Sequence, residues 1–301
     1  MANLNDLINH INFTTEDLEE IDEALINLID TIKTKANEGK VAKIIEYYKF
    51  GSIQRKTKIK PLDDVDIIYV VGTAEKKIGS NMHTITNCSL TFGPEKHQPE
   101  NNISSIILLN DLRGAISETY SRSEVRRNQE VVNVYLSSYE VGFDIVPAFD
   151  ITNMGYLLIP AGKGNHNWKQ TKPQAGVDFF NSANTRHNGL LRNAIKIIKY
   201  WFKKKKIKTP GSYHLECVLC YAFNGSLTVY DSLVNALYYA YSNINYNNYL
   251  INCPDPTNMT GPLDSELSTE DTNKIVSEAN SAKALLNNIP EFVKYIDEDI
   301  V

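Results

Sequence analysis

The sequence lacks several features that would place the protein in a special class. Its 301 residues contain four cysteines, Cys88, Cys217, Cys220 and Cys253, and their spacing shows no disulfide framework. It has no run of about 20 apolar residues and no secretory signal, which favours a protein of the reducing cytoplasm that does not enter a membrane. The net charge of −5 argues against a protein that coats nucleic acid, because such proteins are usually basic overall.

The chain otherwise has an ordinary globular composition, with 42% hydrophobic and 22% charged residues. Cys217 and Cys220 form a C-x-x-C pair inside an apolar run. No second pair of Cys or His stands at a matching spacing, so we expect both thiols to face a helical core rather than bind zinc.

The segment from Phe50 to Thr57, FGSIQRKT, combines a tight turn with positive charge. Gly51 has no Cβ atom, so the backbone can turn sharply and approach a phosphate. Ser52 offers an N–H and a hydroxyl at the start of a short helical turn, where the helix dipole favours anions. A Gly-Ser pair alone is typical of an ordinary turn, but the cations that follow it predict a triphosphate site. These cations are Arg55, Lys56, Lys58 and Lys60.

Three aspartates on apolar strands predict a metal site. Asp64 and Asp66 are two positions apart, so they project from the same face of a strand. Asp144 lies on a second alternating strand and can arrive from a neighbouring position in the sheet. Carboxylates on such strands need a partner such as a metal. Two Mg²⁺ ions about 4 Å apart can clamp the attacking and leaving oxygens of an in-line displacement. This arrangement is typical of a template-free nucleotidyltransferase, in which Asp144 would also accept the proton of the attacking hydroxyl.

The order of periodic segments predicts an α+β fold. We expect strands over 44–50, 65–71, 130–136 and 140–147, with a hairpin between the last two. Helices are expected over 14–35, 103–120, 177–183, 187–205, 212–223, 228–242 and 270–286. Residues 72–100 are expected to form a loop, and 161–173 a linker. The prediction is a mixed-sheet catalytic lobe over 1–160, a helical nucleotide-binding lobe over 161–301, and a cleft between them.

The helical segments carry a second group of candidate residues. Lys199 lies on the flank of its helix, which ends in the run Lys203–Lys206, where cations suit the helix dipole. The simplest interpretation of this run is a solvated helix end, and a surface for RNA or a protein partner is the alternative. Ser212 is expected to cap the next helix, and Glu216 is expected to be a structural hydrogen bonder.

Together these segments resemble the cGAS/DncV-like nucleotidyltransferases, or CD-NTases, of bacterial CBASS antiphage systems. This family is related to oligoadenylate synthetase within the DNA polymerase β-like superfamily. The resemblance spans about residues 15–288. It is carried by GSIQRKTKIKPL at 51–62, DVD at 64–66, FDIVPA at 143–148, W-x-x-T-x-P at 168–173, KYW at 199–201, SYHLE at 212–216 and DPT at 255–257.

The resemblance implies a bilobal polymerase β-like fold and a role for each matching residue. Asp64, Asp66 and Asp144 would bind two Mg²⁺ ions, for which Mn²⁺ can substitute. Gly51 and Ser52 would contact the donor triphosphate.

The remaining roles implied by the resemblance fall on the helical part of the chain. Lys199 and Ser212 would close on the phosphates, and Tyr213 would stack on the donor base. Asp255 would approach the nucleotide. The sequence has no counterpart of the His-Cys-Cys-Cys zinc cluster found in the family's animal DNA sensors.

We therefore expect a cytoplasmic, monomeric enzyme that makes a cyclic di- or trinucleotide second messenger from NTPs, with ATP, GTP or both as the expected substrates. Its expected role is antiphage signalling with CBASS regulatory or effector proteins, without binding to nucleic acid or membrane. One alternative is the synthesis of linear oligonucleotides or nucleotide transfer to RNA or protein. A non-catalytic nucleotide sensor is the other alternative, although such a module has no need for three converging carboxylates. The residues do not define the bases, the linkage or the ring size.

Overall fold

The protein is described by a computed structural model that covers residues 3–71, 76–78, 88–90, 105–151, 156–161, 168–259 and 261–300. For 76–78, 88–90 and 151 only the backbone is described. Most of the loop expected at 72–100 therefore lies outside the described residues. The paired strands β3 (Lys76–Ile78) and β4 (Cys88–Leu90) fall inside that range.

Packing divides the chain into two units. The helical unit comprises Met1–Phe13, Gly51–Pro61 and Pro173–Val301, and the sheet unit comprises Thr14–Phe50 and Leu62–Lys172. The partition of function at residues 160 and 161 stays a prediction. The packing units have other boundaries than 160 and 161, because the segments Met1–Phe13 and Gly51–Pro61 pack with the C-terminal helices.

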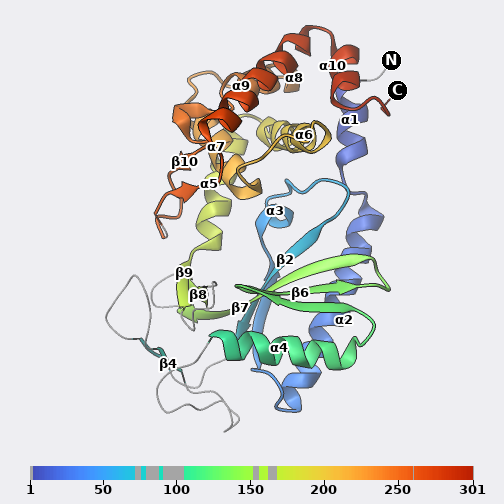
Figure 1. The fold of residues 1–301 in the computed structure, drawn as a ribbon, viewed down its shortest axis with the longest axis vertical. Helices are drawn as coiled ribbons and strands as arrows, with labels where there is room; N and C mark the ends of the chain where they lie inside the picture. The colour runs from blue at the N-terminus through green and yellow to red at the C-terminus, as the bar shows by residue number, and fades with distance from the viewer. Residues whose placement is uncertain are drawn as a thin grey trace. The chain divides into compact units, whose positions relative to one another are not determined.

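The sheet unit is built on one mixed sheet of seven strands with the order β1-β2-β7-β6-β5, extended by β8 and β9 at the far end of β7 (Figure 1). Strands β2 and β7 are parallel, and the other pairs are antiparallel. The strands are β1 (Ile44–Lys49), β2 (Asp64–Val71), β5 (Glu124–Asn128), β6 (Val131–Leu136), β7 (Val141–Ile151), β8 (Tyr156–Pro160) and β9 (Trp168–Thr171). The predicted α+β class with a mixed sheet is confirmed.

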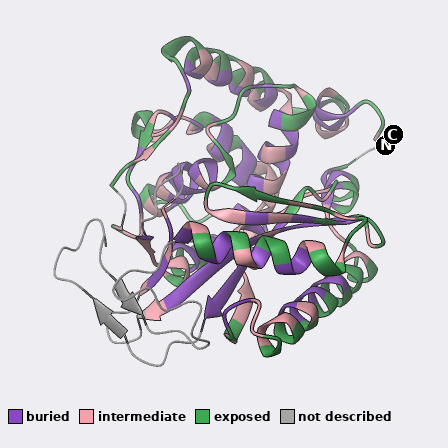
Figure 2. Cartoon of the chain, turned by 60° about the horizontal axis from the view of Figure 1, so that its bottom comes forward, coloured by how far each residue is buried: buried purple, intermediate pink, exposed green. Residues whose placement is uncertain are grey.

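Helices α2 (Thr15–Asn37) and α4 (Ser105–Thr119) complete the sheet unit. The side chains of Thr14 and Asp17 form a capping box at the start of α2. Helix α4 packs on β5, β6 and β8, and α2 packs on α4. In Figure 2 the central strands are largely buried, whereas each helix has a buried and an exposed side. This pattern is the amphipathicity that the periodic sequence predicts.

The helical unit is organised around α6 (Leu190–Lys204), which α1, α5, α7, α8 and α10 all contact. Its buried side includes Ile195, Ile198 and Trp201, as the spacing of apolar residues indicates. The other helices are α1 (Leu4–Ile11), α3 (Gly51–Gln54), α5 (Pro173–Arg186), α7 (Ser212–Gly225), α8 (Leu233–Ser242), α9 (Thr269–Ala284) and α10 (Ile289–Ile296), with single turns η3 (Tyr246–Asn248) and η4 (Leu285–Asn287). Strands β10 (Asn252–Cys253) and β11 (Leu263–Asp264) form a short hairpin in this unit.

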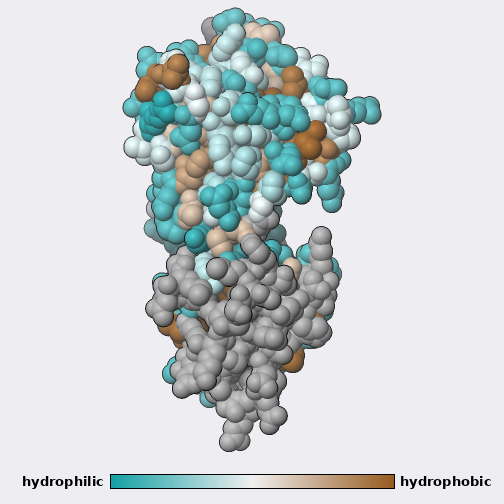
Figure 3. All heavy atoms as spheres, turned by 90° about the vertical axis from the view of Figure 1, so that its left-hand side faces the viewer, coloured by the Kyte–Doolittle hydropathy of each residue, from teal (hydrophilic) through white to brown (hydrophobic). Residues whose placement is uncertain are grey.

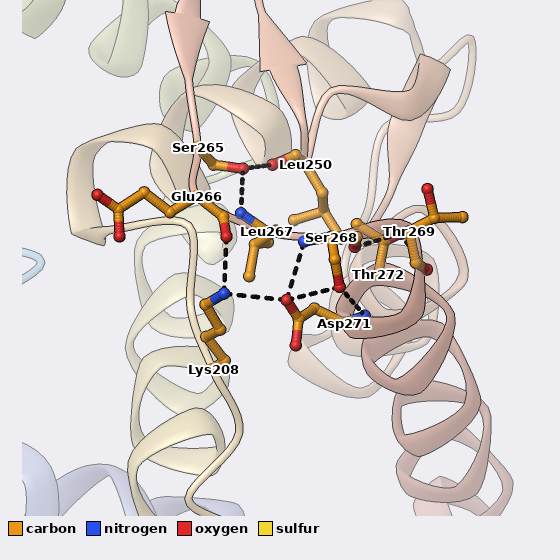
Figure 4. Close-up of polar contacts among 9 residues, drawn as sticks. All are labelled: Lys208, Leu250, Ser265, Glu266, Leu267, Ser268, Thr269, Asp271 and Thr272. Atoms are coloured by element: carbon orange, nitrogen blue, oxygen red, sulfur yellow. Dashed lines mark hydrogen bonds and ion pairs between the residues drawn. The ribbon is translucent and has the colours of Figure 1, made fainter.

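The start of α9 illustrates how polar residues fix the helix ends (Figure 4). The Ser268 hydroxyl accepts from the N–H of Asp271 at 3.1 Å, and Asp271 Oδ2 accepts from the N–H of Ser268 at 2.8 Å. Lys208 donates to the same carboxylate at 3.0 Å and to the carbonyl of Glu266 at 2.6 Å. These contacts tie the loop that follows α6 to the first turn of α9.

Two sequence expectations need correction. Residues 168–171, expected inside a linker, form β9, because Trp168 is buried and meets Phe149 edge to face with ring centroids 4.7 Å apart. Helix α8 begins at Leu233 rather than near Thr228, since the Ser232 hydroxyl caps it by accepting from the N–H of Asn235.

Cys217 and Cys220 are free and buried on α7, which confirms the core placement of the C-x-x-C pair. In the part of the chain that the structure describes, no helix is long and apolar enough to cross a membrane. The face shown in Figure 3 is largely hydrophilic over its described residues, with hydrophobic residues in small, separate groups.

Candidate functional site

Asp66 and Asp144 are neighbours across the two central parallel strands of the sheet unit. The register of β2 and β7 pairs Asp66 with Asp144 and Asp64 with Gly142. Asp66 and Asp144 are half-buried, and Asp64 is exposed at the first position of β2. The expected arrival of Asp144 from a neighbouring strand is confirmed. All three carboxylates therefore belong to the first half of two adjacent strands.

Gly142 leaves the space that Asp64 occupies. A Cβ atom at position 142 would collide with the Asp64 carboxylate and would lie 2.9 Å from the carbonyl oxygen of Asp63. The missing side chain at 142 thus allows the Asp64 carboxylate to lie over β7, on the strand that carries Asp144.

Asn133 on β6 is a site residue that the sequence did not reveal. The antiparallel register of β6 and β7 pairs Asn133 with Asp144, and Asn133 Nδ2 donates to Asp144 Oδ1. This hydrogen bond fixes the orientation of the carboxylate. The register of the predicted hairpin was the signal that could have identified Asn133. Leu136 pairs with Val141 next to the turn, and counting three residues away from the turn on each strand pairs Asn133 with Asp144.

The three aspartates fit a hard divalent cation by type and by strand position. Carboxylate oxygens are the ligands that Mg²⁺ prefers. Among the described residues, no three His, Cys, Asp or Glu side chains are gathered closely enough to form a ready metal site, and all three aspartates take part in other polar interactions. Like-charged carboxylates repel one another, so a bound cation is what would draw these side chains together.

The Gly-Ser turn forms α3, the four-residue helix that follows β1 directly. Gly51 has a φ of 65°, a left-handed conformation that favours glycine, in agreement with the predicted sharp turn. Ser52 is buried, and its carbonyl accepts from the N–H of Thr57 at 2.8 Å. The turn therefore closes on itself over residues 51–58.

A buried carboxylate joins this turn to α6 and α7. Glu216 on α7 is 2% exposed. It accepts from Arg55 Nε and from the Thr57 hydroxyl, the latter at 2.8 Å, and it forms an ion pair with Lys199 of α6. Lys199 Nζ also donates to the carbonyl of Thr57 at 3.4 Å. Glu216 is thus a structural hydrogen bonder, as expected, but its partners are two of the candidate phosphate-binding cations.

The electrostatics of this cluster follow from burial and opposite charge. Burial alone would raise the pKa of Glu216, but Lys199 and Arg55 outweigh it, so this pKa is lowered and the carboxylate stays ionised. Burial alone would lower the pKa of Arg55, but the adjacent Glu216 carboxylate contributes to a net rise in this pKa. Burial and the nearby cations Arg55 and Lys58 lower the pKa of Lys199, whereas Glu216 raises it. Burial is the largest of these effects, so the pKa of Lys199 is lowered.

Ser212 and Tyr213 begin α7, close in the chain to Glu216. Gly211 is the N-cap residue, with a φ of 101°, so the expectation that Ser212 caps the helix is wrong. Gly211 takes that position because it adopts a backbone conformation that other residues avoid. Ser212 is exposed at the first helical position. The Tyr213 ring is half-buried, with the Arg55 guanidinium 5.1 Å from its centroid.

Asp255 organises its own loop. Its carboxylate accepts from the N–H of Thr257 at 2.9 Å, from the Thr257 hydroxyl at 2.7 Å and from the N–H of Met259 at 3.2 Å. Asp255 is buried. These hydrogen bonds give Asp255 a structural role in its loop, and its approach to the nucleotide stays a prediction.

The run Lys203–Lys206 is exposed at Lys203, Lys204 and Lys206, in agreement with a solvated helix end, and half-buried at Lys205. Lys204 Nζ lies 2.9 Å from the buried carboxylate of Asp297, and Lys205 Nζ lies 3.7 Å from the centroid of the Tyr295 ring. The end of α6 therefore holds the C-terminal segment through an ion pair and a cation–π contact.

Comparison with known proteins agrees with this geometry. The family described as Second Messenger Oligonucleotide or Dinucleotide Synthetase (SMODS) domain matches residues 95–184. The chain is 28% identical over 281 residues to the "Probable cyclic nucleotide synthase" of Bacillus cereus (strain VD146), covering 89% of this chain and 81% of that protein. It is 23% identical over 230 residues to the cyclic AMP-AMP-AMP synthase of an Acinetobacter species, covering 76% of this chain and 60% of that protein.

The fold is also that of a solved structure, the Vibrio cholerae di-nucleotide cyclase DncV in complex with ATP and GTP. The TM-score is 0.68 at 12% identity, with 95% of this chain and 89% of the other covered. The fold is that of a polymerase β-like nucleotidyltransferase. The fold and the sequence relatives agree with the resemblance to the cGAS/DncV-like nucleotidyltransferases (CD-NTases).

Proposed function

We propose that the protein is a metal-dependent nucleotidyltransferase that joins NTPs into a cyclic di- or trinucleotide. The observation that carries the proposal is the pairing of Asp66 with Asp144 across parallel β2 and β7, with Asp64 over Gly142. Relatives named as cyclic nucleotide synthases support the choice of a cyclic product. ATP, GTP or both are the proposed substrates, and antiphage signalling with CBASS partners is the proposed role.

The proposed reaction is attack of a ribose hydroxyl on the α-phosphate of a bound NTP, with pyrophosphate as the leaving group. Asp64, Asp66 and Asp144 would hold two Mg²⁺ ions, which when bound stabilise the charge on the attacking and leaving oxygens. Asp144, oriented by Asn133, is the proposed acceptor of the hydroxyl proton. A second or third transfer would close the ring.

The donor nucleotide would be bound by residues of the helical unit. Gly51 and Ser52 would meet the triphosphate at the turn, together with Lys199 and Ser212, and the exposed position of Ser212 leaves its hydroxyl accessible. Tyr213 would stack on the base. The contribution of these residues is positioning and charge stabilisation.

One experiment tests the proposal against its alternatives. The protein is incubated with four labelled NTPs and Mg²⁺ or Mn²⁺, the mixture is digested with phosphatase, and the products are analysed by mass spectrometry. Phosphatase-resistant products with the mass of a cyclic oligonucleotide support the proposal. Linear products favour the first alternative, and the absence of pyrophosphate release with every NTP mixture favours a nucleotide sensor.

A further inference from the structure

The single negative charge of Glu216 neutralises only one of the two positive charges that it contacts. Arg55 donates to its Oε2 atom and Lys199 pairs with its Oε1 atom, so one negative charge serves two positive charges. The side chains of Arg55 and Lys199 are 7% and 8% exposed. A surplus of one positive charge is therefore held at a site that is almost completely buried.

Such a surplus is costly in the absence of an anion. Burial of a charge destabilises a protein unless the charge is paired and hydrogen-bonded. The remaining partners of the cluster are neutral: the Thr57 hydroxyl donates to Glu216, and the Thr57 carbonyl accepts from Lys199. These neutral contacts do not cancel the charge of the cluster.

The cluster also explains why the Gly-Ser turn packs with the helical unit. The segment Gly51–Pro61 lies in the chain between two strands of the sheet unit, yet it belongs to the helical unit. Arg55 and Thr57 both reach Glu216 on α7, and Arg192 of α6 donates to the carbonyl of Arg55 at 3.3 Å. The turn is therefore held by buried polar contacts to α6 and α7.

We propose that Glu216 is a positioning residue that aligns Arg55 and Lys199 beside the Gly-Ser turn and sets the surplus positive charge offered to the triphosphate of the donor NTP. This inference rests on the proposed function and deepens it. Glu216 does not touch the nucleotide. Its single charge leaves enough attraction to bind the triphosphate, and keeps that attraction weak enough for pyrophosphate to leave.

Three variants change the surplus charge in defined steps. Glu216→Gln raises it from one to two, Arg55→Gln lowers it to zero, and the double variant Glu216→Gln/Arg55→Gln returns it to one. Dissociation constants for ATP, GTP and inorganic tripolyphosphate are measured by calorimetry, together with KM and kcat for the NTPs that the wild type uses. The control is Asp297→Asn, which neutralises another buried carboxylate of the helical unit that pairs with a lysine.

Glu216→Gln is expected to bind triphosphates about fivefold more tightly, the factor for one unit charge acting across about 4 Å of water-like medium. Its KM and its kcat should both fall, because pyrophosphate leaves more slowly. Arg55→Gln should bind about fivefold more weakly, and the double variant should return to the wild-type affinity. Asp297→Asn should bind triphosphates as the wild type does.

A purely structural role for Glu216 gives a different result. Glu216→Gln would then raise KM or leave it unchanged, and the double variant would not recover, and either outcome overturns the proposal. If Glu216→Gln does not fold, Arg55→Gln still decides, because equal affinities in Arg55→Gln and wild type contradict the charge balance. A wild type that binds no NTP would instead refute the proposed function itself.

Discussion

Asp64 and Gly142 face each other across β2 and β7, and the Asp64 carboxylate fills the space that a side chain at position 142 would need. The position of a proposed metal ligand thus depends on the absence of a side chain on the adjacent strand. Since a misplacement of about 1 Å in an active site can cost about a hundredfold in rate, this relationship can be tested directly.

We expect Gly142→Ala to lower the rate of product formation by about a hundredfold, because the new Cβ atom displaces Asp64. The matched control is Gly114→Ala on α4, where a Cβ atom meets nothing within 4 Å. That variant should keep full activity and gain about 0.5–1 kcal/mol of stability as a helical Gly-to-Ala change. Rates are measured by pyrophosphate release and stability by urea unfolding. Equal activity of Gly142→Ala and wild type would contradict the assigned role of Asp64.

The double variant Asp64→Asn/Asp66→Asn should make no product and should be at least as stable as the wild type without metal. Neutralising two like charges on one face of a strand removes the repulsion between them. Mass spectrometry of the products and thermal unfolding in EDTA check the two parts. Product formation by the folded double variant would refute the metal site.

Tyr213→Ala is expected to weaken donor binding more than it slows the chemical step. Stacking of a base on an aromatic ring contributes about 1–3 kcal/mol, which corresponds to about 5- to 150-fold in affinity. Tyr213→Phe, which keeps the ring, serves as the control and should bind nearly as the wild type. An unchanged apparent KM of Tyr213→Ala for every NTP would show that the ring serves packing alone.

The stability of the protein should rise between about pH 8 and pH 10.5 through Lys196. Burial, with the cations Arg192 and Lys199, lowers its pKa to about 8 from the ordinary value of 10.5. In this window the unfolded state binds more protons than the folded state, so the free energy of unfolding increases with pH. The free energy of unfolding of Lys196→Met should therefore exceed that of the wild type by a larger amount at pH 7.5 than at pH 10.

Urea unfolding at these two pH values checks this prediction. Lys203→Met, at an exposed position on the same helix, is the control and should show the same pH dependence as the wild type. A Lys196→Met protein whose difference from the wild type does not change between pH 7.5 and pH 10 would contradict the expected titration.

Charge reversal at Lys204 should destabilise the protein by about 2 kcal/mol, because it places a second negative charge beside the buried Asp297. This magnitude lies between those of exposed and buried ion pairs, since the Lys204 side chain is 35% exposed. Lys203→Glu should change stability by less than about 0.5 kcal/mol. Thermal unfolding separates the two, and equal effects would show that the ion pair is not formed in solution.

Local patterns predicted the elements that carry the proposed chemistry. The alternation around Asp66 and Asp144 indicated two strands, and apolar spacing indicated α2, α6 and α7. Both kinds of signal reside in neighbouring residues, so they can be read without knowledge of the packing. The roles of Gly51, Ser52 and Lys199 in nucleotide binding stay predictions.

Contacts between distant residues could not be predicted in the same way. Arg55 and Glu216 are 161 positions apart, and no local period relates them. The same holds for the packing of α1. His10 on this helix lies in hydrogen-bond contact with Tyr200, with 3.1 Å between its Nε2 atom and the Tyr200 hydroxyl oxygen. Strand β9 was assigned to a linker because its four residues are too few to show alternation. Its antiparallel pairing with β8 defines it, and Trp168 on it is buried.

The return of Gly51–Pro61 to the helical unit has a consequence for dissecting the protein. The chain passes from one packing unit to the other after Phe13, Phe50, Pro61 and Lys172. A single cut therefore cannot release either unit intact. A fragment that starts at Pro173 would carry Glu216 and Lys199 without Arg55 and Thr57. Glu216 would then keep one of its three described partners, and Lys199 one of its two. Exchange of parts between relatives would succeed only if all three segments of the helical unit were exchanged together.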